Sequence, residues 1–337
     1  MSLFNVVSQL ASRGAFVPVV IDCGSAVTKV AYKGRILWEQ QTVVAVDRLT
    51  EEGVSIGTTA SEQLPADASH RLRMVNPVQN GLVANISVLR FYLNQLLKKI
   101  TWVDGSSISS FAPLVLIERF DQSNVARKQL LSACSNLGRK VLVVSEKKAI
   151  SLSSDAVHLP TWVFDFGFSH TSCALYDVDG YSVGNAFPWG LNRIYAALEK
   201  ATARNDMALT PHQLEMVLQQ IITVPSAEGT ITVRKIGLTV KQLSTGASIH
   251  AIISNQDLET QTILSEWLWM LKQHVLYLSR SVEERKLPSQ FYCLGGGSLL
   301  RGLPSAVASQ LLLQLQTNLS GLTSLAVPLS HSYDNKK

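Results

Sequence analysis

Charge and cysteine are both scarce in this chain. Charged residues make up 16% of its 337 residues, against about 25% in an average soluble domain. A surface with so little charge suggests that neighbouring subunits or lipid cover much of it. The four cysteines are scattered through apolar segments, with no CxxC pair and no Cys/His spacing for a metal. We therefore expect reduced thiols in the core of a cytoplasmic protein.

Long hydrophobic runs and basic clusters are missing as well. No stretch of about 20 apolar residues occurs, so no segment is expected to span a bilayer. Residues 1–20 lack a basic start and a cleavage site, so no signal peptide is predicted. The net charge of +5 is mild and no basic–aromatic cluster occurs, which argues against nucleic-acid binding. At 337 residues the chain exceeds what one hydrophobic core usually supports, which predicts two lobes.

One short motif occurs twice. Residues 19–24 have the pattern of a buried strand that ends in Asp-x-Gly, and residues 163–167 have the same pattern. A threonine follows the aspartate by six residues in both copies: Thr28 follows Asp22, and Thr171 follows Asp165. Two strand–turn–strand units with matching flanks predict a duplicated domain with a cleft between the copies.

Periodic apolar patterns predict helices and strands around the two motifs. Between the motifs we expect a helix, a strand, a second helix capped by Ser123 and a further strand (residues 83–100, 114–117, 123–138 and 140–144). After the second motif we expect helices at 192–200, 211–222 and 259–284, strands at 230–240, 248–254 and 291–294, and a helix after Leu299. The strand–helix–strand order predicts an α/β fold.

Glycines and small residues gather where a nucleotide needs close backbone contacts. Backbone N–H groups bind phosphate where no side chain prevents the approach. Residues 24–26 therefore form one candidate phosphate turn, and residues 167–171 form its mate. Asp22 and Asp165 would hold Mg²⁺, mostly through water. Residues 295–297 are three glycines after a predicted strand and leave a flat place for a nucleoside.

The ordered motifs resemble those of the actin-like ATPase superfamily, and of its MreB family in particular. Residues 22–28 are similar to the MreB opening, and residues 75–85 to its Pro-x-x-x-Gly-x-Ile-Ala-Asp stretch. Residues 190–193 stand where MreB has Gly-Gly-Asp-Arg, and residues 294–301 match Gly-Gly-Gly-Ala-Leu-Leu-Arg. The resemblance covers nearly the whole chain. It implies an actin-like fold of two duplicated ribonuclease-H-like lobes with a nucleotide cleft between them.

The resemblance also implies a domain organisation. Residues 1–16 are a candidate amphipathic membrane helix, and residues 17–150 form the first lobe, with a small subdomain at about 35–75. Residues 151–310 form the second lobe, with a small subdomain at about 190–255. Residues 311–337 return to the first lobe and end as a tail.

The site of the family is transferred to this chain residue by residue. The resemblance implies ATP or GTP as cofactor, with Mg²⁺ held by Asp22 and Asp165. Glu146 and Thr171 are the candidate catalytic residues; Glu146 would orient the attacking water, and Lys147 replaces the proline of the family. The candidate nucleotide-binding residues are Gly24, Ser25, Ala26, Thr28, Gly167, Ser169, His170, Gly190, Gly295, Gly296, Gly297 and Ser298. An end-of-strand salt bridge is the alternative for Glu146, and a hydrogen-bonded loop residue is the alternative for His170.

The second phosphate turn departs from the family pattern. MreB has Asp-Ile-Gly-Gly-Gly-Thr-Thr, and here Phe168 and Ser169 replace two glycines while His170 replaces a threonine. We expect the added Cβ atoms to restrict φ, and the phenyl ring to crowd the approach of the backbone to phosphate. Hydrolysis is therefore expected to be weak or lost.

Two apolar segments are candidates for membrane contact. Four apolar side chains share one face of a predicted N-terminal helix suited to a lipid headgroup layer: Leu3, Phe4, Val7 and Leu10. Trp102, in a loop region that also contains Phe111, is a second candidate because aromatic side chains favour the membrane interface. Alternatively, both segments pack against their own lobe.

The resemblance favours a cytoskeletal homopolymer of head-to-tail protofilaments, peripheral on the inner face of the cell membrane. This expectation rests on family likeness, since a head-to-tail contact leaves no periodic pattern in a sequence. The alternative is a non-polymerising, actin-like adaptor or membrane anchor with a pseudo-ATPase site. A sugar kinase is disfavoured because no motif supplies an acidic residue for a sugar substrate.

Overall fold

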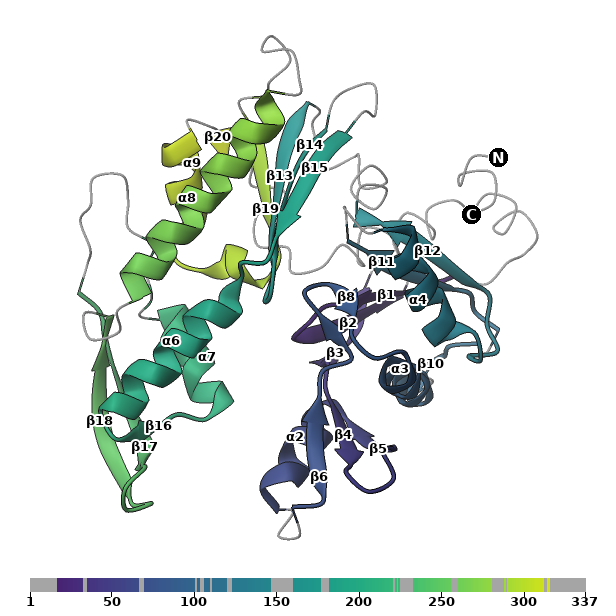
Figure 1. Ribbon diagram of the computed structural model, residues 1–337, viewed down its shortest axis with the longest axis horizontal. Coiled ribbons are helices and arrows are strands. Elements are labelled where there is room, and N and C mark those ends of the chain that lie inside the picture. The colour runs from purple at the N-terminus through teal and green to yellow at the C-terminus, as the bar shows by residue number, and fades with distance from the viewer. Residues whose placement is uncertain are drawn as a thin grey trace. The chain divides into compact units, whose positions relative to one another are not determined.

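The described residues form two compact units, one within Met1–Asp155 and the other within Ala156–Thr323. The computed structural model describes residues 17–32, 35–66, 70–100, 102–103, 106–109, 111–119, 123–146, 160–176, 182–220, 222, 224, 233–255, 260–280, 288, 290–311 and 314–315. The predicted N-terminal membrane helix and the tail after residue 315 lie outside these residues. Figure 1 shows the elements of each unit, which are described separately below.

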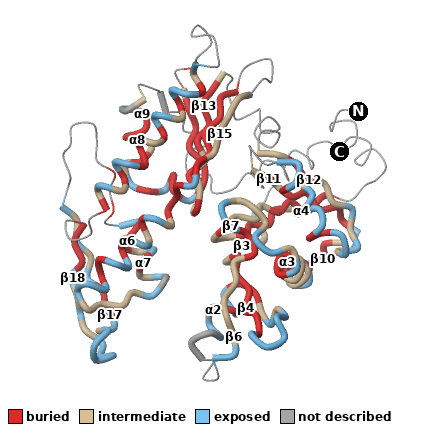
Figure 2. Tube along the Cα trace, viewed as in Figure 1, coloured by how far each residue is buried: buried red, intermediate tan, exposed pale blue. Residues whose placement is uncertain are grey.

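The first unit is built on a mixed five-stranded sheet with the order β12-β11-β1-β2-β3. Its strands are β1 (Val19–Cys23), β2 (Val27–Tyr32), β3 (Arg35–Gln41), β11 (Leu114–Glu118) and β12 (Val141–Ser145). The central strand β1 pairs in parallel with β11 and antiparallel with β2. Its residues Val19, Val20 and Ile21 are fully buried, as a strand covered on both faces requires. Figure 2 shows this strand region as buried.

Two helices of the first unit begin at side-chain caps. Ser123 accepts a hydrogen bond from the Ala126 amide at the start of α4 (Asn124–Cys134), which confirms the predicted cap. Asn85 accepts one from the Val88 amide at the start of α3 (Ile86–Ile100). The helix expected from residue 83 therefore starts later, because Leu82–Val83 forms strand β8 against β7 (Val78–Gln79).

A small subdomain of the first unit follows β3. Its sheet has the order β5-β4-β6 and one helix, α2. The elements are β4 (Val44–Asp47), β5 (Gly53–Ile56), α2 (Gly57–Ala66) and β6 (Leu72–Val75). Two further short strands, β9 (Trp102–Val103) and β10 (Ser106–Ser107), pair after α3.

The second unit repeats the arrangement of the first. Its sheet has the order β15-β14-β13-β19-β20, with the motif strand again in the centre, its hairpin partner on one side and a parallel strand on the other. The strands are β13 (Thr161–Phe166), β14 (Thr171–Tyr176), β15 (Ser182–Phe187), β19 (Gln290–Leu294) and β20 (Gln314–Leu315). The internal duplication predicted from the two Asp-x-Gly motifs is therefore visible as two sheets of the same order.

Helices and a smaller sheet complete the second unit. The helices are α6 (Leu191–Arg204), α7 (Pro211–Gln220), α8 (Thr260–Ser279), the 3₁₀ turn η3 (Gly296–Leu299) and α9 (Leu303–Leu311). The smaller sheet is formed by β16 (Met207–Ala208), β17 (Lys235–Gln242) and β18 (Ser248–Ser254). Helix α8 buries one face, including Trp267 and Leu271, in the core of the unit. In the described part of the chain, no helix is long and apolar enough to cross a membrane.

An ion pair between a buried carboxylate and a partly exposed arginine ties α4 to the carboxyl edge of the first sheet. Glu118 ends β11 and is 6% exposed, and its Oε1 lies 3.2 Å from Nη1 of Arg127. Arg127 also donates from Nη2 to the Val143 carbonyl at 2.7 Å, so it bridges two neighbouring strands. Burial raises the pKa of the Glu118 carboxyl, and the charge of Arg127 opposes part of that rise.

The raised pKa of Glu118 predicts a pH-dependent stability. In the folded chain the pKa of Glu118 lies above the ordinary value of 4.5. Between these two pKa values, the carboxyl is protonated in the folded chain and ionised in the unfolded chain. The free energy of unfolding of the wild type should therefore fall, relative to that of Glu118→Gln, as the pH rises from 4.5 through the folded pKa. Urea denaturation from pH 4.5 to 8 measures this, with the exposed Glu52→Gln as control. A wild-type advantage that grows with pH would contradict the assignment.

Candidate functional site

The first motif forms a tight hairpin turn. Asp22 pairs with Lys29 and Cys23 pairs with Thr28, and the Gly24 amide donates to the Val27 carbonyl at 3.1 Å. A Cβ on Gly24 would lie 2.7 Å from that carbonyl oxygen, so a larger residue would break the closing hydrogen bond. The tip of the turn therefore consists of two small residues that follow a required glycine.

The second motif forms the same turn in the same register. Asp165 pairs with Ser172 and Phe166 pairs with Thr171, and the Gly167 amide donates to the His170 carbonyl at 3.0 Å. A Cβ on Gly167 would lie 2.8 Å from that oxygen. Each unit thus presents an aspartate two residues before a glycine-closed turn, at the end of its central strand.

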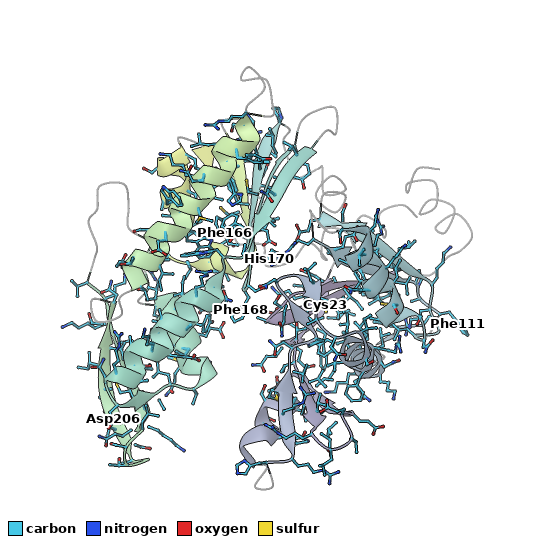
Figure 3. All side chains as sticks on the ribbon, viewed as in Figure 1. Cys23, Phe111, Phe166, Phe168, His170 and Asp206 are labelled. Atoms are coloured by element: carbon cyan, nitrogen blue, oxygen red, sulfur yellow. The ribbon has the colours of Figure 1, made fainter. Side chains whose placement is uncertain are left out.

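Phe168 and Ser169 do not strain the backbone of the second turn. Neither residue is among the non-glycine residues with positive φ, so the tip uses backbone angles that any L-residue adopts. The Phe168 ring packs at 5.7 Å from the ring of Tyr195 on α6 and against the core of its own unit (Figure 3). The turn therefore keeps its shape without the glycines that the family has there.

Helix α6 begins directly on the carbonyl groups of the second turn. The amides of Leu191 and Asn192 donate to the carbonyls of Gly167 and Phe168 at 3.2 and 2.8 Å. A Cβ on Gly190 would lie 2.4 Å from the Phe168 carbonyl oxygen. This glycine, predicted to bind the cofactor, thus allows the helix to approach the turn.

Both threonines of the motifs lie beneath their turns. Thr28 is fully buried, with its Oγ1 2.9 Å from Oγ1 of Thr42. Thr171 is also fully buried; its hydroxyl donates to the Trp189 carbonyl and accepts from Nε1 of Trp267, each at 2.7 Å. Thr28 was predicted to bind the cofactor and Thr171 to act in catalysis. Either role would require the hydroxyl to give up a present protein partner for the nucleotide.

The glycine turn after β19 lies against the second motif. Gly295 has a φ of +77°, and a Cβ there would lie 2.2 Å from Oδ1 of Asp165. A Cβ on Gly297 would lie 2.7 Å from Cβ of Phe166, and the buried Ser298 hydroxyl donates to the Gly295 carbonyl at 2.7 Å. At Gly296 the nearest atom to an added Cβ is 3.6 Å away. Gly296 is therefore the glycine of this turn with room for a ligand.

The residues of each unit fit a phosphate-binding role. Among the described residues, the backbone amides of Ala26 and Phe168 donate to no protein acceptor, so each tip offers an N–H group to an anion. In the first unit the Ser25 hydroxyl accepts from the Gly81 amide at 3.2 Å, which holds the turn against the loop before α3. No sequence pattern indicates this contact, because residues 75–85 only supported the family resemblance.

Carboxylates stand at equivalent places in the two hairpins. Asp22 and Asp165 are both half-buried and provide the oxygen ligands that Mg²⁺ prefers. Glu146 directly follows β12 and is half-buried. It lies on the same carboxyl edge as Asp22, with β11 between, which is about 10 Å at ordinary strand spacing. His170 is half-buried at the end of the second turn.

Comparisons with known proteins match this architecture over nearly the whole chain. A family model described as MreB/Mbl protein matches residues 17–336. MreB5 of Spiroplasma citri bound to ADP gives a TM-score of 0.73 at 16% identity, covering 94% of each chain, and its AMPPNP-bound form gives 0.71 at 17% with the same coverage. A MamK double helical filament gives 0.68 at 17%, covering 93% of this chain and 98% of that chain. No curated protein sequence matches. These likenesses confirm the predicted actin-like α/β fold.

The hydrogen bond from Trp267 to Thr171 predicts a difference between two tryptophans of α8. Trp267→Phe removes the buried donor and leaves Thr171 without it, so the free energy of unfolding should fall by about 1–3 kcal/mol. Trp269→Phe is the matched control, because Trp269 is 58% exposed on the same helix and should change stability by less than about 0.5 kcal/mol. Thermal denaturation of both variants measures the difference. Equal losses would show that the hydrogen bond does not stabilise the turn.

Proposed function

The chain belongs to the MreB/Mbl family of actin-like proteins, and on that premise we propose that it assembles head to tail into filaments on a membrane surface. Its two hairpin turns bind the phosphates of ATP or GTP. The observation that carries the proposal is the identical register of these turns, each closed by a glycine amide and preceded by an aspartate.

The proposed nucleotide site assigns a role to each group. The amides at the tips of residues 24–27 and 167–170 bind the phosphate oxygens, and Gly296 leaves space for the nucleoside. Asp22 and Asp165 hold Mg²⁺ through its water shell, and the ion neutralises phosphate charge. Glu146 orients water at the terminal phosphate. Because the Thr171 hydroxyl already has two protein partners, hydrolysis is proposed to be slow.

Self-assembly is supported by the relatives and by the composition. Solved structures of MreB5 and MamK resemble this chain, and one of them is a double helical filament. A chain with 16% charged residues has surface that neighbouring copies would cover. The engaged Thr171 hydroxyl also favours the second candidate, a pseudo-ATPase adaptor that binds nucleotide without polymerising.

Membrane contact is proposed at a turn of the first unit that holds Phe111 outward. Phe111 is 73% exposed, and its amide donates to Oγ of Ser109 at 3.2 Å (Figure 3). Nη1 of Arg139 donates to the carbonyls of Ser109 and Ala112 at 3.1 and 3.2 Å, which fixes the turn. An aromatic ring held outward in this way suits the headgroup layer of a membrane. The Trp102 side chain and residues 1–16 lie outside the described part of the chain.

Filament formation should depend on the first turn. Wild-type protein with ATP or GTP and Mg²⁺ should pellet and show filaments by electron microscopy. Gly24→Ala should weaken nucleotide binding about tenfold or more, because the added Cβ displaces the Val27 carbonyl. Gly138→Ala is the control for a general loss of stability, since Gly138 has a φ of +65° but nothing within 4 Å of an added Cβ. A wild type that stays monomeric under all nucleotide, salt and lipid conditions would contradict polymerisation. The non-polymerising adaptor would then remain as the function.

Lipid binding should depend on Phe111. Phe111→Ser should lower the partition onto vesicles of anionic lipid about tenfold, as expected from losing one inserted aromatic ring. Val125→Ser is the matched control, because Val125 is 66% exposed on α4 of the same unit. Co-sedimentation with vesicles measures both. Equal binding of Phe111→Ser and wild type would exclude this turn as a membrane contact.

A further inference from the structure

One peptide group, between Asn80 and Gly81, contacts both the first turn and the residue that follows a neighbouring strand. Its N–H, on Gly81, donates to Oγ of Ser25 at 3.2 Å. Its carbonyl, on Asn80, accepts from Nη1 of Arg119 at 2.6 Å. The N–H and the C=O of a planar trans peptide point in opposite directions. Ser25 and Arg119 therefore hold this peptide from its two sides.

The peptide lies at the tip of a hairpin of a defined type. Asn80 and Gly81 have φ angles of +51° and +71° and form the two-residue loop between β7 and β8. Positive φ at both central residues identifies a type I′ turn, for which Asn-Gly is a preferred sequence. The base of the hairpin is fixed, because Val78 is buried in the core and the Ala84 amide donates to the Pro77 carbonyl at 2.8 Å.

The orientation of the central peptide decides whether the hairpin can contact the first turn. A flip of this peptide converts a type I′ turn into a type II′ turn and reverses both its N–H and its C=O. After a flip, the Gly81 amide would point away from Ser25. Asn80 opposes the flip, because a type II′ turn favours glycine at the first central position. Arg119 opposes it as well, because the reversed carbonyl could not accept from its guanidinium.

Arg119 reaches the hairpin from a fixed position. It directly follows Glu118, the last residue of β11, whose buried carboxylate forms the ion pair with α4. Strand β11 runs parallel to β1, with Leu116 opposite Ile21. Arg119 and Gly24 each stand three residues beyond these partners. The backbone of Arg119 therefore leaves the sheet at the same edge as the first turn.

We propose that Arg119 is a positioning residue for nucleotide binding. By holding the Asn80 carbonyl, it directs the Gly81 amide at the buried Ser25 hydroxyl and so fixes the first turn in the shape that binds phosphate. The guanidinium bond is charge-assisted, and such bonds are about twice as strong as those between neutral groups. This role rests on the proposed binding of phosphate by the first turn, and Arg119 acts through Ser25 without touching the phosphate.

Hydrogen exchange of the Gly81 amide in the nucleotide-free chain, measured by NMR, tests the hold of Arg119 on the hairpin. Arg119→Met removes the donor but keeps an unbranched side chain, and should raise the exchange rate about tenfold. Arg90→Met is the matched control, because Arg90 on α3 of the same unit also donates to a backbone carbonyl, that of Ser132, at 2.8 Å. It should leave the exchange of Gly81 unchanged. Unchanged exchange in Arg119→Met, or an equal rise in Arg90→Met, would overturn the proposal.

Nucleotide affinity provides the second test. Arg119→Met should weaken the binding of a non-hydrolysable ATP analogue with Mg²⁺ about tenfold, whereas Arg90→Met should bind it as the wild type does. Equal affinity of Arg119→Met and the wild type would overturn the positioning role. A wild type that binds no nucleotide would overturn the proposed function, and the exchange of Gly81 would still decide whether Arg119 holds the hairpin.

A double-mutant cycle separates positioning from a simple effect of charge. Ser25→Ala removes the group through which Arg119 acts, so the losses of affinity in Ser25→Ala and Arg119→Met should not add in the double variant. An effect of the Arg119 charge on the phosphates would survive Ser25→Ala. Additive losses would therefore assign the effect to charge and overturn the positioning role.

Discussion

The candidate site of each unit depends on one hydrogen bond, which a glycine amide donates across a hairpin turn to the carbonyl three residues further on. The bond joins Gly24 to Val27 and Gly167 to His170. In both turns a Cβ on the glycine would meet that carbonyl oxygen at less than 3 Å. With the bond in place, the strand pairing fixes the aspartate two residues before the glycine and buries the threonine beneath the turn. In each unit, the strand that leads into this turn is the central strand of the five-stranded sheet.

The two turns share a backbone shape but have different supports. In the first unit the Thr42 amide donates to the Ala26 carbonyl, and the Ser25 hydroxyl accepts from Gly81. In the second unit the start of α6 donates to the turn carbonyls, and Trp267 bonds to the buried threonine. The second turn is therefore connected to two helices of its own core. A change in the packing of α6 or α8 would be transmitted to it directly.

Much of this arrangement could be predicted, because the apolar runs before each Asp-x-Gly and the cap at Ser123 are local signals. The small subdomain of β4, β5 and β6 was expected only as a range, since such short strands form through tertiary pairing. The packing of Phe168 could not be predicted, because the direction of its ring depends on Tyr195, a distant residue on α6. The contact of Gly190 with the second turn was equally invisible in the sequence, because it depends on a carbonyl twenty-two residues earlier.

The turn of each unit is proposed to bind nucleotide phosphate in an assembling chain. A cryo-electron microscopy map of the wild-type protein with Mg²⁺ and a non-hydrolysable ATP analogue tests it most directly. The account predicts a filament in which phosphate density contacts the backbone amides of residues 24–27 and of residues 167–170. A filament map with no nucleotide at either turn, or with phosphates bound elsewhere on the chain, would contradict it.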